Sequence, residues 1–172
     1  MTDHLDWTHN VVDIPAAGLT REREATESER QAIIGALGLL ALERLLARYR
    51  IEALAGGGYR LSGKISADVD QACVVTLEPV NARIEEPFSV EFWPDLEPDD
   101  SEEDVRALAA PEVEKFERDI IPAGRIIFET LASSLDPYPR RDGVEFNWQD
   151  PHADEPEKAS PFAVLSKFKD KD

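Results

Sequence analysis

The clearest structural signal in the sequence is the stretch YRLSGKISADVD (residues 59–70), in which apolar and polar side chains alternate. This period of two is typical of a β-strand with one buried and one solvent-facing side. A second alternating stretch, VNARIEEPFSVEFW, covers residues 80–93. Because glycine tolerates positive φ, Gly56-Gly57-Gly58 predicts a hairpin turn before the first stretch. The predicted buried faces are Tyr59, Leu61, Ile65, Ala67 and Val69, and then Val80, Ala82, Ile84, Phe88, Val90 and Phe92.

The segment before the glycine turn, residues 39–54, allows two interpretations. A helical spacing joins Leu39, Leu42, Leu46 and Tyr49. A strand-like alternation joins Ala47, Tyr49, Ile51 and Ala53. We favour a strand from about Leu45, because the predicted hairpin needs a partner strand.

Two stretches indicate helices. Thr26 and Glu29 form a capping box at the start of the first, and Gly38 is a suitable stop. The second lies within residues 120–135 and is ended by Asp136-Pro137-Tyr138-Pro139, since proline cannot continue a helix. Its expected sheet-facing residues are Gly124, Ile127, Phe128, Leu131 and Leu135. Nearer the N-terminus, one extended strand ending at Pro15 is expected to hold Val11, Val12, Ile14 and Leu19.

Together these elements predict an α+β fold, in which an antiparallel β-meander around residues 45–93 packs against two or three helices. One domain is expected over residues 1–139, with an acidic flexible linker at about 94–112 inside it. Residues 140–159 are expected to be a disordered linker. Residues 160–172 are expected to form a short helix or tail that begins at Ser160-Pro161.

The charge of the chain is strongly negative. Its 172 residues hold 36 Asp and Glu against 19 Lys and Arg, a net charge of −17. Phosphates would be repelled by most of this surface, so non-specific nucleic-acid binding and DNA partners are not expected. The acidic N-terminus, MTDHLDWTHN, has no apolar region typical of a secretory signal, and no apolar run is long enough to span a bilayer. A cytoplasmic protein without a membrane partner is therefore expected.

Reactive residues are scarce. Cys73 is the single cysteine, which excludes an intramolecular disulfide and a multi-thiolate metal site within one chain. The three histidines, His4, His9 and His152, lie near the ends of the chain, where a catalytic triad is poorly supported. The acidic run over residues 95–104 lacks the central glycine and spacing of a calcium loop. We therefore expect no catalytic residue, no metal and no cofactor.

Three pieces of the sequence together resemble one protein family. They are ISADVDQACVVTLEPVNARIEEPFSVEFWP (residues 65–94), GRIIFETLASSLDPYP (residues 124–139) and SPFAVLSKFK (residues 160–169). In this order they resemble the YceD family, the large ribosomal RNA subunit accumulation proteins of bacteria. Many members carry Cys-x-x-Cys at the turn, where this chain has Cys73 and Thr76. A metal bound by the cysteine-bearing members would therefore not be expected here.

The resemblance implies a role in the synthesis, processing or stability of large-subunit (23S) ribosomal RNA. We expect a non-enzymatic ribosome-biogenesis factor that binds this RNA, a basic large-subunit ribosomal protein, or both, and we favour the protein because the chain is so acidic. The acidic segment 95–104 could shield such a basic protein before assembly. The alternatives are a metal-dependent RNA hydrolase and an interaction module unrelated to ribosomes.

Candidate contact residues fall into three groups. The polar side of the first hairpin carries Arg48, Arg50, Arg60 and Lys64. These suit RNA phosphates, but an ordinary solvated face with cross-strand pairs to Glu52 and Asp68 is the favoured interpretation. The turn between the alternating strands carries Cys73, Thr76, Glu78 and Pro79, where Cys73 is expected to be a small buried thiol. The terminal segment carries Phe162, Leu165 and Phe168, which suit docking either on a partner or on the chain's own sheet.

Overall fold

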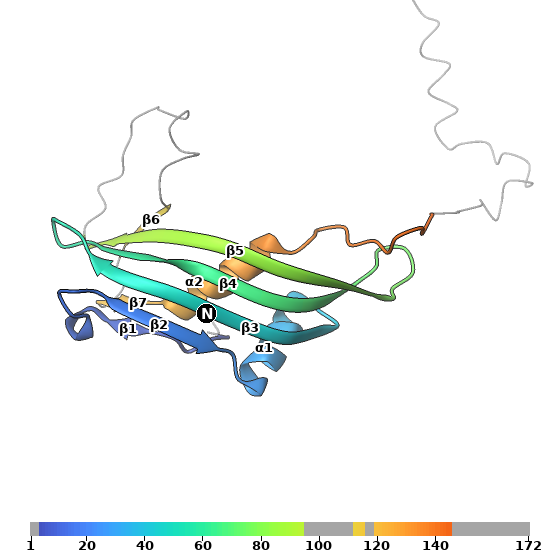
Figure 1. Cartoon of the computed structure of the whole chain (residues 1–172), viewed down its shortest axis with the longest axis horizontal. Coiled ribbons are helices and arrows are strands. Elements are labelled where there is room, and N and C mark those ends of the chain that lie inside the picture. Colours follow the sequence, from blue (N-terminus) through green and yellow to red (C-terminus); the bar gives the residue numbers. More distant parts are fainter. Residues whose placement is uncertain (1–3, 95–111, 116–118, 146–172) are drawn as a thin grey trace, which may run out of the picture. The chain divides into compact units, whose positions relative to one another are not determined.

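A five-stranded sheet forms the body of the protein (Figure 1). The computed structural model describes residues 4–94, 112–115 and 119–145. The strand order is β2-β3-β4-β5-β6, and β2 to β5 pair antiparallel in sequence order. The strands are β2 (Leu19–Glu24), β3 (Ala41–Ala53), β4 (Tyr59–Ala72), β5 (Pro79–Trp93) and β6 (Glu112–Lys115). The predicted α+β meander is thus confirmed.

The central hairpin follows the alternation of the sequence. Gly56 and Gly57 have φ values of 93° and 89°, as the predicted turn requires. The inward side chains of β4 are Leu61, Ile65, Ala67 and Val69, and each is at most 1% exposed. The ambiguous segment is a strand, but β3 begins at Ala41 rather than near Leu45. Its start still pairs with β4, with Ala41 opposite Asp70, after a shift of register between Leu42 and Arg44.

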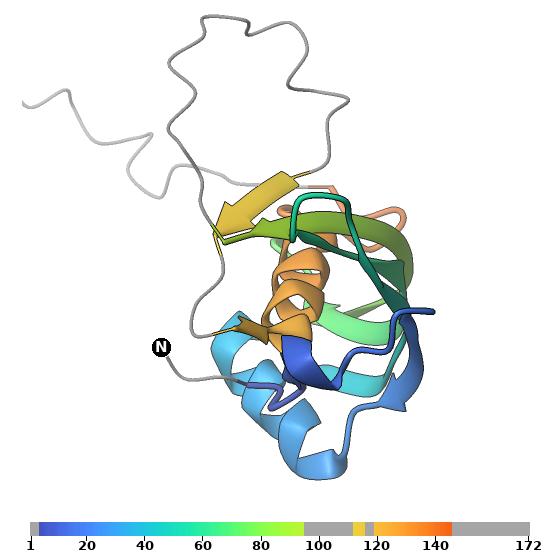
Figure 2. The same ribbon diagram turned by 90° about the vertical axis from the view of Figure 1, so that its left-hand side faces the viewer.

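The sheet curls around helix α2 (Ala123–Ser134), as Figure 2 shows. The inward side of α2 is buried at Ala123, Gly124, Ile126, Ile127 and Leu131. Helix α1 (Glu27–Leu37) contacts β3. It has the predicted capping box, in which the Thr26 hydroxyl accepts from the Glu29 N–H, and Gly38 follows it as the C-cap. Both predicted helices that fall on described residues are therefore confirmed.

The N-terminal prediction is wrong. Residues 11–13 form a short 3₁₀ helix, η1 (Val11–Asp13), because the Asn10 side chain accepts from the Val12 N–H and caps it. Leu19 belongs to another element, β2, where it lies opposite Ile51. Between them Gly18 donates to the Pro15 carbonyl and reverses the chain. The extended piece is instead β1 (His9–Asn10), which pairs with β7 (Ile120–Ile121) in a separate two-stranded sheet.

Strand β6 is a further difference from the predicted antiparallel meander, because it pairs parallel to β5 from Val90 to Trp93. The chain divides into two compact units, residues 1–142 and 143–172, and every helix and strand that the structure describes lies in the first. The expected linkers and the terminal helix fall almost wholly outside the described residues, so those boundaries stay predictions. In the described ranges, no helix has the length and apolar character needed to cross a membrane.

Candidate functional site

The four candidate bases do share one face of the sheet. Arg48 of β3 lies opposite Lys64 of β4, and Arg60 lies opposite Glu52. Since side chains alternate along each strand, Arg50 points to the same side as Arg48. The sequence prediction of a common polar face is therefore consistent with the register.

Each of these four bases has a carboxylate partner on that face. Arg48 pairs with Glu22 at 2.5 Å, Arg50 with Glu52, Arg60 with Glu91 and Lys64 with Glu85, the last three at 2.6 Å. Of the two partners predicted from the sequence, Glu52 pairs with a candidate base, whereas Asp68 pairs with Arg83 at 3.2 Å. An RNA phosphate would compete with a carboxylate for each base. The arrangement favours the ordinary solvated face, while an RNA contact stays an untested prediction.

The same ion pairs lower the pKa of two carboxyl groups. The hydrogen bond from Lys64 lowers the pKa of Glu85, and the hydrogen bond from Arg60 lowers the pKa of Glu91. Glu22 acts in the opposite sense on its partner, because its hydrogen bond with Arg48 raises the pKa of that guanidinium. All three effects favour the charged pair, although exposed pairs of this kind contribute little to stability.

The turn between β4 and β5 encloses Cys73 completely, with 0% of the residue exposed. The predicted buried thiol is thus confirmed. The Cys73 N–H donates to the Glu78 carbonyl at 2.8 Å, and the Leu77 N–H donates to the Cys73 carbonyl at 2.9 Å. Leu77 adopts the left-handed region with φ 62° and leaves its side chain 75% exposed. Pro79 is the first residue of β5, a position at which proline is tolerated.

The Cys73 sulfur is surrounded by hydrogen-bond donors. The Thr76 hydroxyl makes the largest contribution, followed by the backbone N–H groups of Arg141, Thr76 and Val75, and together they lower the pKa of the thiol from 9.0 to about 6. These donors outweigh the cost of enclosing a thiolate. Sequence reasoning paired Cys73 with Thr76 only as positions of a motif, whereas in the folded chain the Thr76 hydroxyl is also the main cause of the lowered thiol pKa.

Residues that follow α2 close this turn from outside. The Val74 N–H donates to the Pro139 carbonyl at 2.9 Å, and Arg141 forms an ion pair with Glu78. Glu78 is therefore paired with Arg141, although about half of its side chain stays exposed. The terminal candidates Phe162, Leu165 and Phe168 lie outside the described residues, as does the acidic run 95–104.

The folded state is expected to gain stability as the pH rises from about 6 toward 9, through Cys73. The pKa of this thiol is lower in the folded chain than in the unfolded chain, so its contribution is lost as the pH falls through about 6. The urea midpoints of the wild type and of Cys73→Ser, which cannot titrate there, should diverge as the pH is raised. Thr76→Val should reduce that divergence, because it removes the hydroxyl donor. Parallel midpoints across this range would contradict the assignment.

One histidine is held more firmly than its place near the N-terminus suggested. His9 Nε2 lies 2.8 Å from the Tyr49 hydroxyl, and the two rings meet edge to face. Burial, followed by the charges of Arg21 and Arg23, lowers the pKa of His9. Across residues 4–94, 112–115 and 119–145, no group of three or more His, Cys, Asp or Glu side chains is placed to hold a metal ion.

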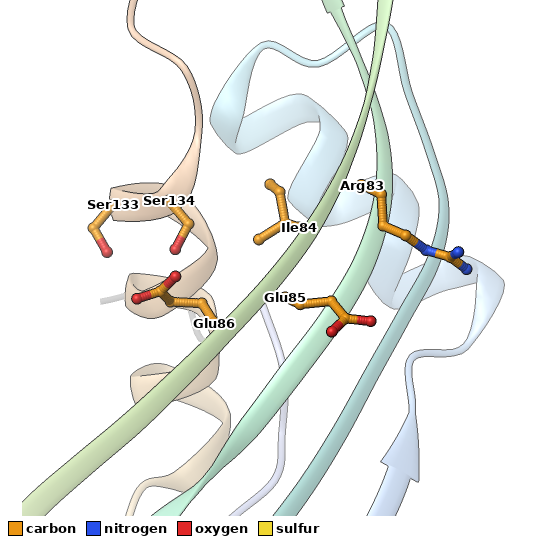
Figure 3. Close-up of a pocket in the computed structure, with 6 residues that line it drawn as sticks. All are labelled: Arg83, Ile84, Glu85, Glu86, Ser133 and Ser134. Carbon is orange, nitrogen blue, oxygen red and sulfur yellow. The ribbon is translucent and has the colours of Figure 1, made fainter.

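A groove between β5 and α2 was not predicted from the sequence. Glu86 of β5 projects toward the helix beside Ser133 and Ser134, whereas Arg83 and Glu85 point away from it (Figure 3). The signal for this groove is visible in hindsight, because Glu86 occupies an inward position in the otherwise apolar series from Val80 to Phe92. A charged side chain on an inward face is a local exception that often accompanies function.

Comparison with known proteins gives one match. The model of the family described as large ribosomal RNA subunit accumulation protein YceD matches residues 61–169, which is more than half of the chain. The matched range begins in β4 and includes the Cys73 turn, β5 and α2. Searches of curated proteins and of solved structures found no match.

Proposed function

This chain belongs to the YceD family of large ribosomal RNA subunit accumulation proteins, and from that premise we propose that it is a non-enzymatic ribosome-biogenesis factor. It supports the synthesis, processing or stability of large-subunit ribosomal RNA and acts in the cytoplasm. The family match over residues 61–169 is the observation that carries the proposal.

The proposed mode of action is binding, with a basic large-subunit ribosomal protein as the main partner. Two observations support a protein rather than RNA. The chain has a net charge of −17, which attracts basic proteins and repels phosphates. The bases best placed for RNA, Arg48, Arg50, Arg60 and Lys64, are each engaged by a carboxylate.

The experiment that tests the proposal is deletion of the gene followed by complementation. Loss of the protein should lower large-subunit ribosomal RNA relative to small-subunit RNA, and the intact chain should restore the ratio. A normal ratio in the deletion strain would favour an interaction module unrelated to ribosomes. Turnover of RNA by the purified protein with Mg²⁺ would favour the hydrolase alternative.

A pull-down with residues 95–104 deleted tests whether that acidic segment contributes to binding basic ribosomal proteins.

A variant with alanine at Arg48, Arg50, Arg60 and Lys64 is expected to restore the RNA ratio as well as the wild type does. The reason is that these bases already pair with carboxylates, and each exposed pair is worth at most about 1 kcal/mol. The matched control replaces the four partner carboxylates, Glu22, Glu52, Glu85 and Glu91, with glutamine. Failure of the alanine variant alone, with both proteins folded, would instead identify these bases as an RNA contact.

A further inference from the structure

One edge of the sheet is open along most of β5. Strand β5 runs from Pro79 to Trp93, yet β6 covers it only from Val90 onward. Among the residues that the structure describes, no strand pairs with residues 79–89 on the side away from β4. An open edge of this kind can be extended by an added strand from another chain.

The hydrogen-bond alternation identifies the groups on that open edge. The Cys73 N–H donates to the Glu78 carbonyl, which starts the ladder between β4 and β5. In an antiparallel ladder every second pair of opposite residues is hydrogen-bonded. Ile84 and Glu86 therefore exchange backbone hydrogen bonds with Ala67 and Ile65. The intervening residues Arg83, Glu85 and Ser89 therefore turn their N–H and C=O groups away from β4. Pro87 falls on the same side, which is where an edge strand tolerates proline.

A groove runs beside this edge, between β5 and α2. Two adjoining hollows, of about 420 and 390 Å³, make up the groove and share Glu86 and Ser133. Their apolar lining includes Ile84, Phe88 and Ile126. Figure 3 shows the Glu86 carboxylate directed toward the serines of the helix. The groove thus offers apolar surface and hydroxyl groups next to unpaired backbone groups.

The charges along the groove favour a basic ligand. Its lining holds Glu85, Glu86, Glu112 and Glu129 against a single base, Arg83. That base is already paired with Asp68, and Glu85 is paired with Lys64 on the outer face. Within the described part of the chain, Glu86 and Glu112 have no ion pair or hydrogen bond through their side chains. Among the described residues that line the groove, these two carboxylates are therefore the ones without a basic partner of their own.

We propose that an extended, basic peptide segment of a partner protein docks along the open edge of β5, with its cationic side chains on Glu86 and Glu112. The peptide backbone bonds to Arg83 and Glu85, while Pro87 limits how far the added strand can run. The inference rests on the proposed function, since it names the site through which a basic protein would be held.

A second copy of this chain fits the edge less well. Two β5 edges brought together would place Glu86 of one copy near the acidic groove of the other, and like charges at close range oppose association. Pro87 also removes a backbone donor from each edge. A basic segment avoids both obstacles. Its positive charge complements the acidic groove, and its backbone N–H groups can pair with the part of β5 that precedes Pro87.

The test measures fluorescence anisotropy of a labelled peptide of alternating lysine and valine, about eight residues long, with the intact chain at one fixed salt concentration. Glu86→Lys should weaken binding about tenfold. Glu43→Lys makes the same change of charge at an exposed site of β3, which β4 separates from β5, and should weaken binding less than about twofold. Equal effects of the two variants would show non-specific attraction and overturn the proposal.

The strand contact is tested separately with two substitutions at one position. Glu85→Pro removes the edge N–H, whereas Glu85→Ala removes only the ion pair with Lys64. The proline variant should bind the peptide about fivefold more weakly than the alanine variant. In the wild type, hydrogen exchange of the Glu85 amide should slow when the peptide is added. Equal affinities with an unchanged exchange rate would overturn the docking mode, as would a stable dimer that Glu85→Pro dissociates.

The outcomes separate this inference from the proposed function. A Glu86→Lys chain that fails to bind the peptide but restores the large-subunit RNA ratio would remove the groove as the functional site and leave the proposed function standing. A wild-type chain that binds the peptide but does not restore the ratio would remove the proposed function instead.

Discussion

Replacing Gly124 with alanine is expected to lower the free energy of unfolding by about 3 kcal/mol. A Cβ atom at this position would lie 2.1 Å from the Leu5 carbonyl oxygen and 2.9 Å from the Leu5 Cβ. The Gly124 N–H also donates to the Trp7 carbonyl at 2.9 Å, which holds the two backbones together. Because the obstacle is the backbone of Leu5, which lies against the buried side of α2, no rotation of a side chain relieves it. Urea-induced unfolding of both proteins provides the measurement.

The matched control is Gly35→Ala in α1. No heavy atom outside its own helix backbone lies within 4 Å of a Cβ built at Gly35. Alanine there should raise the free energy of unfolding by about 0.5–1 kcal/mol, since glycine is the poorer helix former. If Gly124→Ala proved as stable as Gly35→Ala, the close approach of Leu5 to α2 would be wrong.

Truncating Trp7 to alanine is expected to cost about 3–5 kcal/mol of folding free energy, although the residue lies only a few positions from the N-terminus. Its side chain is enclosed, with 1% of the residue exposed. The indole Nε1–H donates to Glu29 at 2.8 Å, and the Arg23 guanidinium lies 4.9 Å from the ring centroid. Trp7 thus joins the N-terminal segment to β2 and α1, and its loss leaves a cavity among all three.

Trp7→Phe separates packing from hydrogen bonding. Phenylalanine keeps an aromatic ring but cannot donate to Glu29, so this variant should lose less stability than Trp7→Ala. The two variants are compared by urea midpoints and by the slope of the transition. Equal losses would mean that the donor rather than the buried ring dominates, contrary to this expectation.

The long strands could be predicted because their signal is local. In β4 and β5 the alternation of side chains reports burial directly, and the capping box of α1 requires only Thr26 and Glu29. Strands β1, β6 and β7 could not be predicted in this way, since elements of two to four residues contain too few positions to show a period. Their existence depends on distant partners, such as Ile121 opposite His9.

The candidate sites also differ in whether their residues are close together in the sequence or are joined only by the fold. Cys73 and Thr76 could be singled out because they occupy the two positions of the Cys-x-x-Cys turn of the resembled family, but the N–H of Arg141, which also lowers the pKa of the thiol, comes from beyond α2. The ion pairs of the basic face required the register, which brings Glu22 beside Arg48 and Glu91 beside Arg60. For the groove, the only local signal in the sequence is the charged Glu86 in an otherwise apolar series. The serines beside it, Ser133 and Ser134, belong to α2, which is distant in the sequence.

The contacts from Pro139 and Arg141 impose an order of assembly on the Cys73 turn. During synthesis the β4–β5 hairpin emerges from the ribosome well before Pro139 and Arg141, so the sulfur first exists without one of its donors and Glu78 without its guanidinium. Only after α2 has been made can this long-range closure be completed, and contacts of such high sequence separation form late. Nascent chains ending before residue 139 should accordingly carry a Cys73 thiol whose pKa is higher than in the complete chain, because the Arg141 N–H is missing.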